Sequence, residues 1–96
     1  MAIYQEILVS YDIEDNKNRK KLFDELKDMG LSSIQKSVFW GHLKDAEIKI
    51  LPTLFEKYCS GEDKAFFVKA NFSKEILKNS FGYDKFDFEE KEFEYI

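Results

Sequence analysis

Asp12 is the residue whose type and position best fit chemistry in this sequence. It closes a stretch rich in β-branched and aromatic side chains, Ile3 to Tyr11, which is typical of a strand. Mg²⁺ prefers one or two carboxylates together with water, so one Asp12 per subunit would suffice for Mg²⁺, or for Mn²⁺, if a two-fold axis paired two copies. The alternative from local sequence is an aspartate that caps the loop after the strand.

A dense basic cluster follows Asp12 and consists of Lys17, Arg19, Lys20 and Lys21. Such a cluster can contact phosphates, and the free amides at the start of a helix would add to it. We therefore predict nucleic-acid binding there. The alternative is ordinary solvated charge, because the acidic residues between positions 24 and 28 partly offset the field.

Other side chains that carry chemistry give weaker signals. Tyr11 and Phe39 are candidates for stacking on bases, with core packing as the alternative. His42 is the only histidine and has no evident catalytic partner in sequence. Cys59 is the only cysteine, which excludes an intrachain disulfide and a cysteine-based zinc site.

Length and composition bound the class of protein. Ninety-six residues with 44% hydrophobic content predict one folded domain. The net charge of -4 argues against a general polyanion binder, but residues 73–96 alone hold 7 acidic and 4 basic side chains, so the acidity lies mostly near the C-terminus. The lone cysteine, and the lack of a signal-peptide or membrane-spanning pattern, predict a cytoplasmic protein with no membrane contact.

The apolar spacing predicts alternating strands and helices. We expect a strand over 3–12, followed by a helix that begins at about residue 17, with Asp15 or Asn16 as its cap, and ends at Gly30. Two strands follow within 33–43, with a bend near Gly41. A helix over 45–58, which Pro52 kinks or splits, and a strand over 65–72 complete the order. Residues 73–78 fit one helical turn and 77–83 a further strand. Beyond Asp84 the pattern fits two alternatives. One is an edge strand, suggested by the period-2 spacing of Phe86/Phe88 and Phe93/Tyr95, and the other is an acidic tail.

This order predicts an α+β, ferredoxin-like βαββαβ fold, in which two helices cover one face of a four-stranded antiparallel sheet. The other face of so aromatic a sheet needs cover, so we predict a homodimer packed through the open faces. The predicted domain spans residues 1–83, with residues 84–96 as an acidic extension.

Three segments together resemble the CRISPR-associated protein two family. The first is the end of the first strand, Ser10-Tyr11-Asp12-Ile13, together with the basic residues that follow it, Arg19-Lys20-Lys21. The second is similar to that family's Gln-x-Ser-Val-Phe signature and reads Ile34-Gln35-Lys36-Ser37-Val38-Phe39. The third is Phe66-Phe67-Val68, in the strand predicted over 65–72.

The resemblance implies a homodimer in which two Asp12 carboxylates face each other as metal ligands and catalytic groups. It implies Mg²⁺-dependent endonuclease activity on RNA or double-stranded DNA, and a role in spacer acquisition for antiviral defence, where the dimer would bridge integrase subunits of CRISPR-associated protein one on duplex DNA. It places Tyr11, Arg19, Lys21 and Phe39 at active-site or nucleic-acid positions, and it implies a C-terminal strand, Leu77–Tyr83, that joins the partner's sheet.

Two features depart from the family pattern. Ser33 stands where relatives often carry an arginine, which weakens the expectation of nuclease activity, and the acidic residues after Asp84 lie outside the core pattern. An alternative is a stand-alone ferredoxin-like domain that binds a small molecule and has no nuclease activity.

Overall fold

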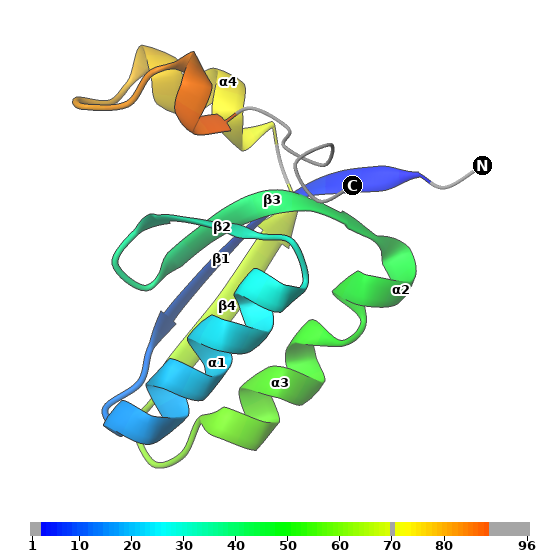
Figure 1. The fold of residues 1–96 in the computed structure, drawn as a ribbon, viewed down its shortest axis with the longest axis vertical. Coiled ribbons are helices and arrows are strands. Elements are labelled where there is room, and N and C mark those ends of the chain that lie inside the picture. Colours follow the sequence, from blue (N-terminus) through cyan, green and yellow to red (C-terminus); the bar gives the residue numbers. More distant parts are fainter. Residues whose placement is uncertain (1–2, 70, 89–96) are drawn as a thin grey trace.

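A computed structural model describes residues 3–69 and 71–88 of the chain. Its elements follow the predicted order and are β1 (Tyr4–Asp12), α1 (Asn16–Asp28), β2 (Ser32–Gln35), β3 (Val38–Lys44), α2 (Asp45–Ile48), α3 (Leu51–Tyr58), β4 (Lys64–Lys69), α4 (Phe72–Lys78) and a 3₁₀ turn (Lys85–Phe88). The four strands form an antiparallel sheet in the order β2-β3-β1-β4. Helices α1 and α3 cover one face of this sheet (Figure 1), which confirms the ferredoxin-like α+β fold.

The core lies between the sheet and the two long helices. Alternation along β1 turns Ile7, Val9 and Tyr11 toward the helices, where all three are buried. They pack in one cluster with Leu22 and Leu26 of α1 and with apolar residues of α3 and β3. Burial of each large aliphatic side chain stabilises the fold by about 1.5–3 kcal/mol, so these contacts anchor the strand that ends at Asp12.

Local signals set the helix boundaries as predicted. Asp15 is the N-cap of α1 and its carboxylate accepts the Asn18 N–H at 2.8 Å. Gly30, with φ +97°, provides the left-handed residue after the helix. Pro52 splits the next helical segment into α2 and α3 and lies in the first turn of α3. Backbone N–H groups in the first turn have no intrahelical acceptor, so proline costs no helical hydrogen bond there.

The bend predicted near Gly41 lies elsewhere. The β2–β3 turn is at Lys36 and Ser37, and Ser37 takes a positive φ of 63°. Gly41 lies inside β3 opposite Ile7, and a Cβ at this position would meet Leu31 Cδ2 at 2.7 Å. Glycine is therefore needed there for close packing of the α1–β2 connection against the sheet, not for a turn.

The C-terminal elements differ from prediction more than the rest. The helical turn expected over 73–78 is confirmed by α4, but β4 ends at Lys69 and the strand predicted over Leu77–Tyr83 is wrong for this structure. Residues 77–78 belong to α4, and Gly82 reverses the chain with φ +90°. Residues 85–88 form a 3₁₀ turn in place of an edge strand at Phe86/Phe88, and Phe93/Tyr95 lie outside the described residues. The crossing of a C-terminal strand to a partner remains a prediction.

The open face of the sheet has two unlike halves. Over β2 and β3, residues 72–88 place an aromatic cover on Trp40, which is only 2% exposed and whose ring lies 5.2 Å from that of Phe88. The Tyr83 hydroxyl donates to the Ile34 carbonyl and fixes this cover to β2. Over β1 and β4, Phe66 and Val68 stay 53% and 44% exposed. The cover therefore leaves one apolar half of the sheet available for a partner.

None of the helices in residues 3–69 and 71–88 is long and apolar enough to cross a membrane.

Candidate nucleic-acid and metal site

Asp12 is the last residue of β1 and its side chain is exposed. In the β1–β4 ladder it stands opposite Lys64. Among the described residues no hydrogen bond or ion pair to its carboxylate is found, because Asp15 performs the capping of α1. The loop-capping alternative therefore does not fit, and Asp12 presents an ionisable group that the described part of the fold does not use.

The loop after Asp12 is held from two sides. Arg19 Nη1 donates to the Ile13 carbonyl at 2.8 Å and to the Glu14 carbonyl at 3.4 Å. From the α3–β4 connection, the Asp63 carboxylate accepts the backbone N–H groups of Glu14 and Ser60, each at 3.0 Å. These two hydrogen bonds lower the pKa of Asp63. Asp63 thus fixes the direction in which the chain leaves Asp12.

Sequence reasoning missed Asp63 as a positioning residue. Asp63 lies 49 residues after its Glu14 partner, in a Gly-Glu-Asp turn that resembles many others. Only the sheet pairing of β1 with β4 brings the two loops together. No signal within the sequence distinguishes this acid from the neighbouring Glu62.

The basic cluster divides into two groups. Arg19 is half-buried, and besides its bonds to the loop it donates to the Asn16 side chain. The three lysines are exposed and, together with Asn16, line one shallow depression on α1; they are Lys17, Lys20 and Lys21. Lys20 also pairs with Asp24 one turn later, at 2.8 Å. The lysines are placed to meet a phosphate backbone, whereas Arg19 mainly organises the loop.

Tyr11 and Phe39 lie on the helix side of the sheet. Phe39 has none of its surface exposed and stacks on Tyr11 at 6.2 Å between ring centroids, so core packing is its role and direct stacking on a base conflicts with its burial. Tyr11 is 5% exposed. Burial raises the pKa of Tyr11, partly opposed by a side-chain hydrogen bond with Ser37 and by the Arg19 charge.

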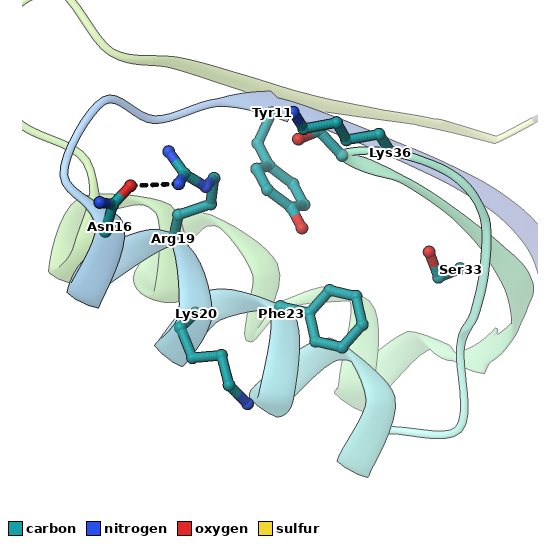
Figure 2. Close-up of a pocket in the computed structure, with 8 residues that line it drawn as sticks. Tyr11, Asn16, Arg19, Lys20, Phe23, Ser33 and Lys36 are labelled. Carbon is teal, nitrogen blue, oxygen red and sulfur yellow. Dashed lines mark hydrogen bonds between the residues drawn. The ribbon is translucent and has the colours of Figure 1, made fainter.

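A cavity of about 350 Å³ lies between α1 and the β2–β3 turn, next to Tyr11. Figure 2 shows Tyr11 and Phe23 projecting into this space, with Ser33 and Lys36 on the hairpin side and Arg19 turned toward Asn16. Ser33, Lys36 and Phe23 were not among the predicted site residues. Ser33, the residue that departs from the family pattern, is therefore one of the residues that line this cavity.

His42 and Cys59 lie in surroundings that differ from those of reactive side chains. The His42 ring contacts that of Trp40 edge-on at 5.3 Å, and in the ladder it stands opposite Glu6 on the open face of the sheet. The pKa of Cys59 is raised, first by burial and then by the Asp63 charge, which disfavours a reactive thiolate.

A divalent ion at Asp12 would need ligands beyond those that the described residues of one chain bring together. Within residues 3–69 and 71–88 no group of three His, Cys, Asp or Glu side chains is arranged to hold a metal ion. One exposed carboxylate without a hydrogen-bond partner fits a hard cation only when a second carboxylate, water or a substrate phosphate completes the shell.

These features define a ferredoxin-like domain with an unused strand-end carboxylate beside a lysine-bearing helix surface. The family model described as CRISPR associated protein Cas2 matches residues 5–76. The chain is also 42% identical, over 88% of its length and 87% of the relative, to a protein of Francisella tularensis subsp. novicida named CRISPR-associated endoribonuclease Cas2 1. The chain therefore belongs to the Cas2 family.

One further relative and two solved structures are also similar to this chain. A protein of Pyrobaculum aerophilum named CRISPR-associated endoribonuclease Cas2 2 is 38% identical over 57% of the chain and 60% of the relative. A crystal structure titled as cas2 has the same fold, with a TM-score of 0.63 over 73% of this chain and 82% of that chain at 23% identity. A hypothetical protein of Thermus thermophilus, TT1823, matches with a TM-score of 0.64 and 28% identity over 71% and 83% of the two chains.

Proposed function

We propose that this chain acts in a CRISPR system as a homodimer that hydrolyses phosphodiester bonds in RNA or duplex DNA, using Mg²⁺ or Mn²⁺ held by two Asp12 carboxylates. The observation that carries the proposal is the exposed Asp12 carboxylate at the end of a buried strand, which makes no bond among the described residues. The printed name of the Francisella relative makes RNA the first substrate to test.

Pairing through the open face would supply the second carboxylate. Alternation along β1 places Leu8, Ser10 and Asp12 on that face, beside the exposed Phe66 and Val68 of β4. An apolar surface of this kind on a small domain favours self-association. We infer that the two-fold axis passes near the C-terminal end of β1, so that each subunit contributes one Asp12.

The chemistry divides between the carboxylates and the lysines. A bound divalent ion would polarise the scissile phosphate and lower the pKa of a water. Asp12 supplies the negative charge that retains the ion, and Arg19 and Asp63 hold the loop that orients Asp12. Lys17, Lys20 and Lys21 would bind the flanking phosphates on the surface of α1.

A second function, as an adaptor in spacer acquisition, rests on the same lysine surface. An α1 helix that offers three exposed lysines in an otherwise acidic chain supports duplex binding that needs no cleavage. In this role the dimer would hold a DNA duplex between integrase subunits of CRISPR-associated protein one. Membership in the Cas2 family disfavours the alternative of a stand-alone ferredoxin-like domain that binds a small molecule.

Cleavage by purified protein tests the nuclease proposal. Labelled single-stranded RNA and duplex DNA would be incubated with Mg²⁺ or Mn²⁺ and the wild type, Asp12→Asn, or the matched control Asp28→Asn, which changes an exposed aspartate on α1. We expect Asp12→Asn to lose about 100-fold or more in rate and Asp28→Asn to keep the wild-type rate. Equal cleavage by all three proteins would assign the activity to a contaminant.

Salt dependence of duplex binding tests the lysine surface. Replacement of Lys17, Lys20 and Lys21 by Glu should weaken binding and flatten the slope of log K against log salt by up to about 0.9 for each lost phosphate contact. A control with the same charge change replaces exposed Lys49, Lys57 and Lys74, which all lie outside α1. An unchanged slope in the α1 variant would remove α1 from the interface.

A further inference from the structure

The cavity beside Tyr11 has a composition unlike that of the whole chain. Three of its lining residues are cationic, none is acidic, and the others are two aromatic rings, two serines and an asparagine: Tyr11, Asn16, Arg19, Lys20, Phe23, Ser33, Lys36 and Ser37. The chain as a whole has 19 acidic and 15 basic residues. A local cationic excess in an acidic protein favours an anionic ligand.

The walls of the cavity also favour a planar aromatic group. Tyr11 comes from β1 and Phe23 from α1, and both rings project into the same space in Figure 2. Both pack against Phe39 beneath them, at 6.2 Å and 5.1 Å between centroids. Buried Phe39 therefore holds the two rings in place. Tyr11, only 5% exposed, closes one side of the cavity, and the partly exposed Phe23 is the ring on which a base entering the cavity can stack.

Polar groups at the rim can fix the orientation of such a ligand. Ser33 and Ser37 place hydroxyls on the hairpin side, and the exposed Lys36 lies between them along the turn. Lys36 makes no ion pair among the described residues, whereas Lys20 pairs with Asp24. Lys36 is thus the cation best placed to bind a phosphate, with Arg19 contributing charge from the opposite wall.

The size of the cavity, about 350 Å³, lies at the lower end of the range for small-molecule sites. It accommodates one mononucleotide and excludes a duplex. We propose that this cavity binds one unstacked nucleotide, with the base on the ring of Phe23, next to Tyr11, and the phosphate at Lys36. The nucleotide is either a free nucleoside monophosphate or the unpaired terminal nucleotide of a strand.

The nucleotide site is separate from the Asp12 site. Tyr11 points to the helix side of the sheet and Asp12, the next residue, to the open side. Binding in the cavity therefore needs neither the metal ion nor the second subunit. The inference goes beyond the proposed phosphodiesterase function, and it holds or fails independently of it.

Nucleotide titration followed by NMR amide shifts tests the inference. With free AMP as the first probe, we expect saturable shifts centred on residues 11, 23 and 33–37, unchanged in Asp12→Asn. Lys36→Ala should raise Kd by about tenfold, as expected for a charge-assisted phosphate contact, and adenosine should bind correspondingly more weakly. Lys49→Ala, which removes an exposed lysine from the α2–α3 connection, should bind AMP as the wild type does.

A second variant keeps the test independent of charge. Ser33→Phe would fill the cavity from the edge strand β2, where Ser33 is exposed and the change should not disturb the core. We expect loss of saturable AMP binding, with the Trp40 fluorescence and far-UV circular dichroism of the wild type. Retention of wild-type AMP affinity by both Ser33→Phe and Lys36→Ala would overturn the assignment.

Two further probes distinguish the sources of the nucleotide. A short duplex with one unpaired 3′ nucleotide and the matching blunt duplex would be titrated in parallel with AMP. Tighter binding of the overhang duplex, lost in Ser33→Phe, assigns the cavity to a strand terminus, and saturable binding of AMP alone assigns it to a free nucleotide. Absence of saturable shifts with every probe up to about 5 mM, an affinity too weak for a site, would refute the inference.

Discussion

Removal of the Phe88 ring should uncover the open face of the sheet over β3. Phe88 contacts three rings, those of Trp40, Tyr83 and Phe72, at centroid distances of 5.2, 5.6 and 5.9 Å. Aromatic pairs of this kind contribute about 0.5–1.5 kcal/mol each beyond burial, and Phe88 is only half-buried. Phe88→Ala should therefore weaken docking of residues 72–88 by about 2 kcal/mol, enough to populate an undocked state.

Trp40 reports this change directly because it is the only tryptophan. In the wild type its indole Nε1 donates to Glu6 at 2.6 Å, and the same carboxylate accepts the Ser73 N–H at 2.7 Å, so the cover and the indole share one anchor. Phe88→Ala should shift the emission of Trp40 to longer wavelength and raise its quenching by acrylamide.

Phe86→Ala is the matched control for this experiment. Phe86 lies two residues earlier in the same 3₁₀ turn, but its side chain is 61% exposed and makes no ring contact with Trp40 among the described residues. It should leave the emission of Trp40 unchanged. Equal spectra for the wild type and Phe88→Ala, or a larger shift in Phe86→Ala, would refute the account of the cover.

Three further predictions concern assembly and pH. Phe66→Glu places charge on the bare half of the open face and should leave a monomer in sedimentation velocity at concentrations where the wild type is dimeric; an unchanged dimer would place the interface elsewhere. Because the pKa of Tyr11 is raised on folding, its stabilising contribution is present below its ordinary value near 10 and is lost as pH rises above it. We therefore expect the Tm of the wild type to fall at alkaline pH and Tyr11→Phe to flatten that fall. The pKa of Asp63 is lowered, so its stabilisation is present above about 3.8 and is lost as pH falls below that value; Asp63→Asn should lower urea stability at pH 7 and narrow its difference from the wild type in acid.

Local signals made much of the fold predictable. Asp15, Gly30 and Pro52 act on their own neighbours, through a cap, a left-handed residue and a missing donor, and each lies where the sequence indicated. Gly41 was misread because glycine is required there by close contact with Leu31, ten residues away in the α1–β2 connection. The C-terminal strand was misread because Phe88 packs on Trp40 of β3 and Phe72 packs on Phe88, and the contact with Trp40 is a long-range one that has no sequence pattern.

The candidate site was predictable to a similar extent. The strand pattern placed Asp12 at an exposed strand end, and helical spacing placed the three lysines on α1. Sequence alone did not show that Arg19 has a different role from those lysines, because that role comes from its hydrogen bonds to carbonyls of the preceding loop. Nor did it place Ser33 and Lys36 opposite Phe23, because only the packed β2–β3 hairpin brings them to α1.

The central claim is that two copies of this chain share a divalent ion through Asp12. Crystals of the wild-type dimer grown with Mn²⁺ test it through anomalous scattering. The account predicts a peak between the two Asp12 side chains, with oxygen ligands at roughly 2.0–2.6 Å and the carboxylates about 4–5 Å apart. A dimer that binds Mn²⁺ elsewhere, or one whose Asp12 carboxylates are too far apart to share an ion, would contradict it.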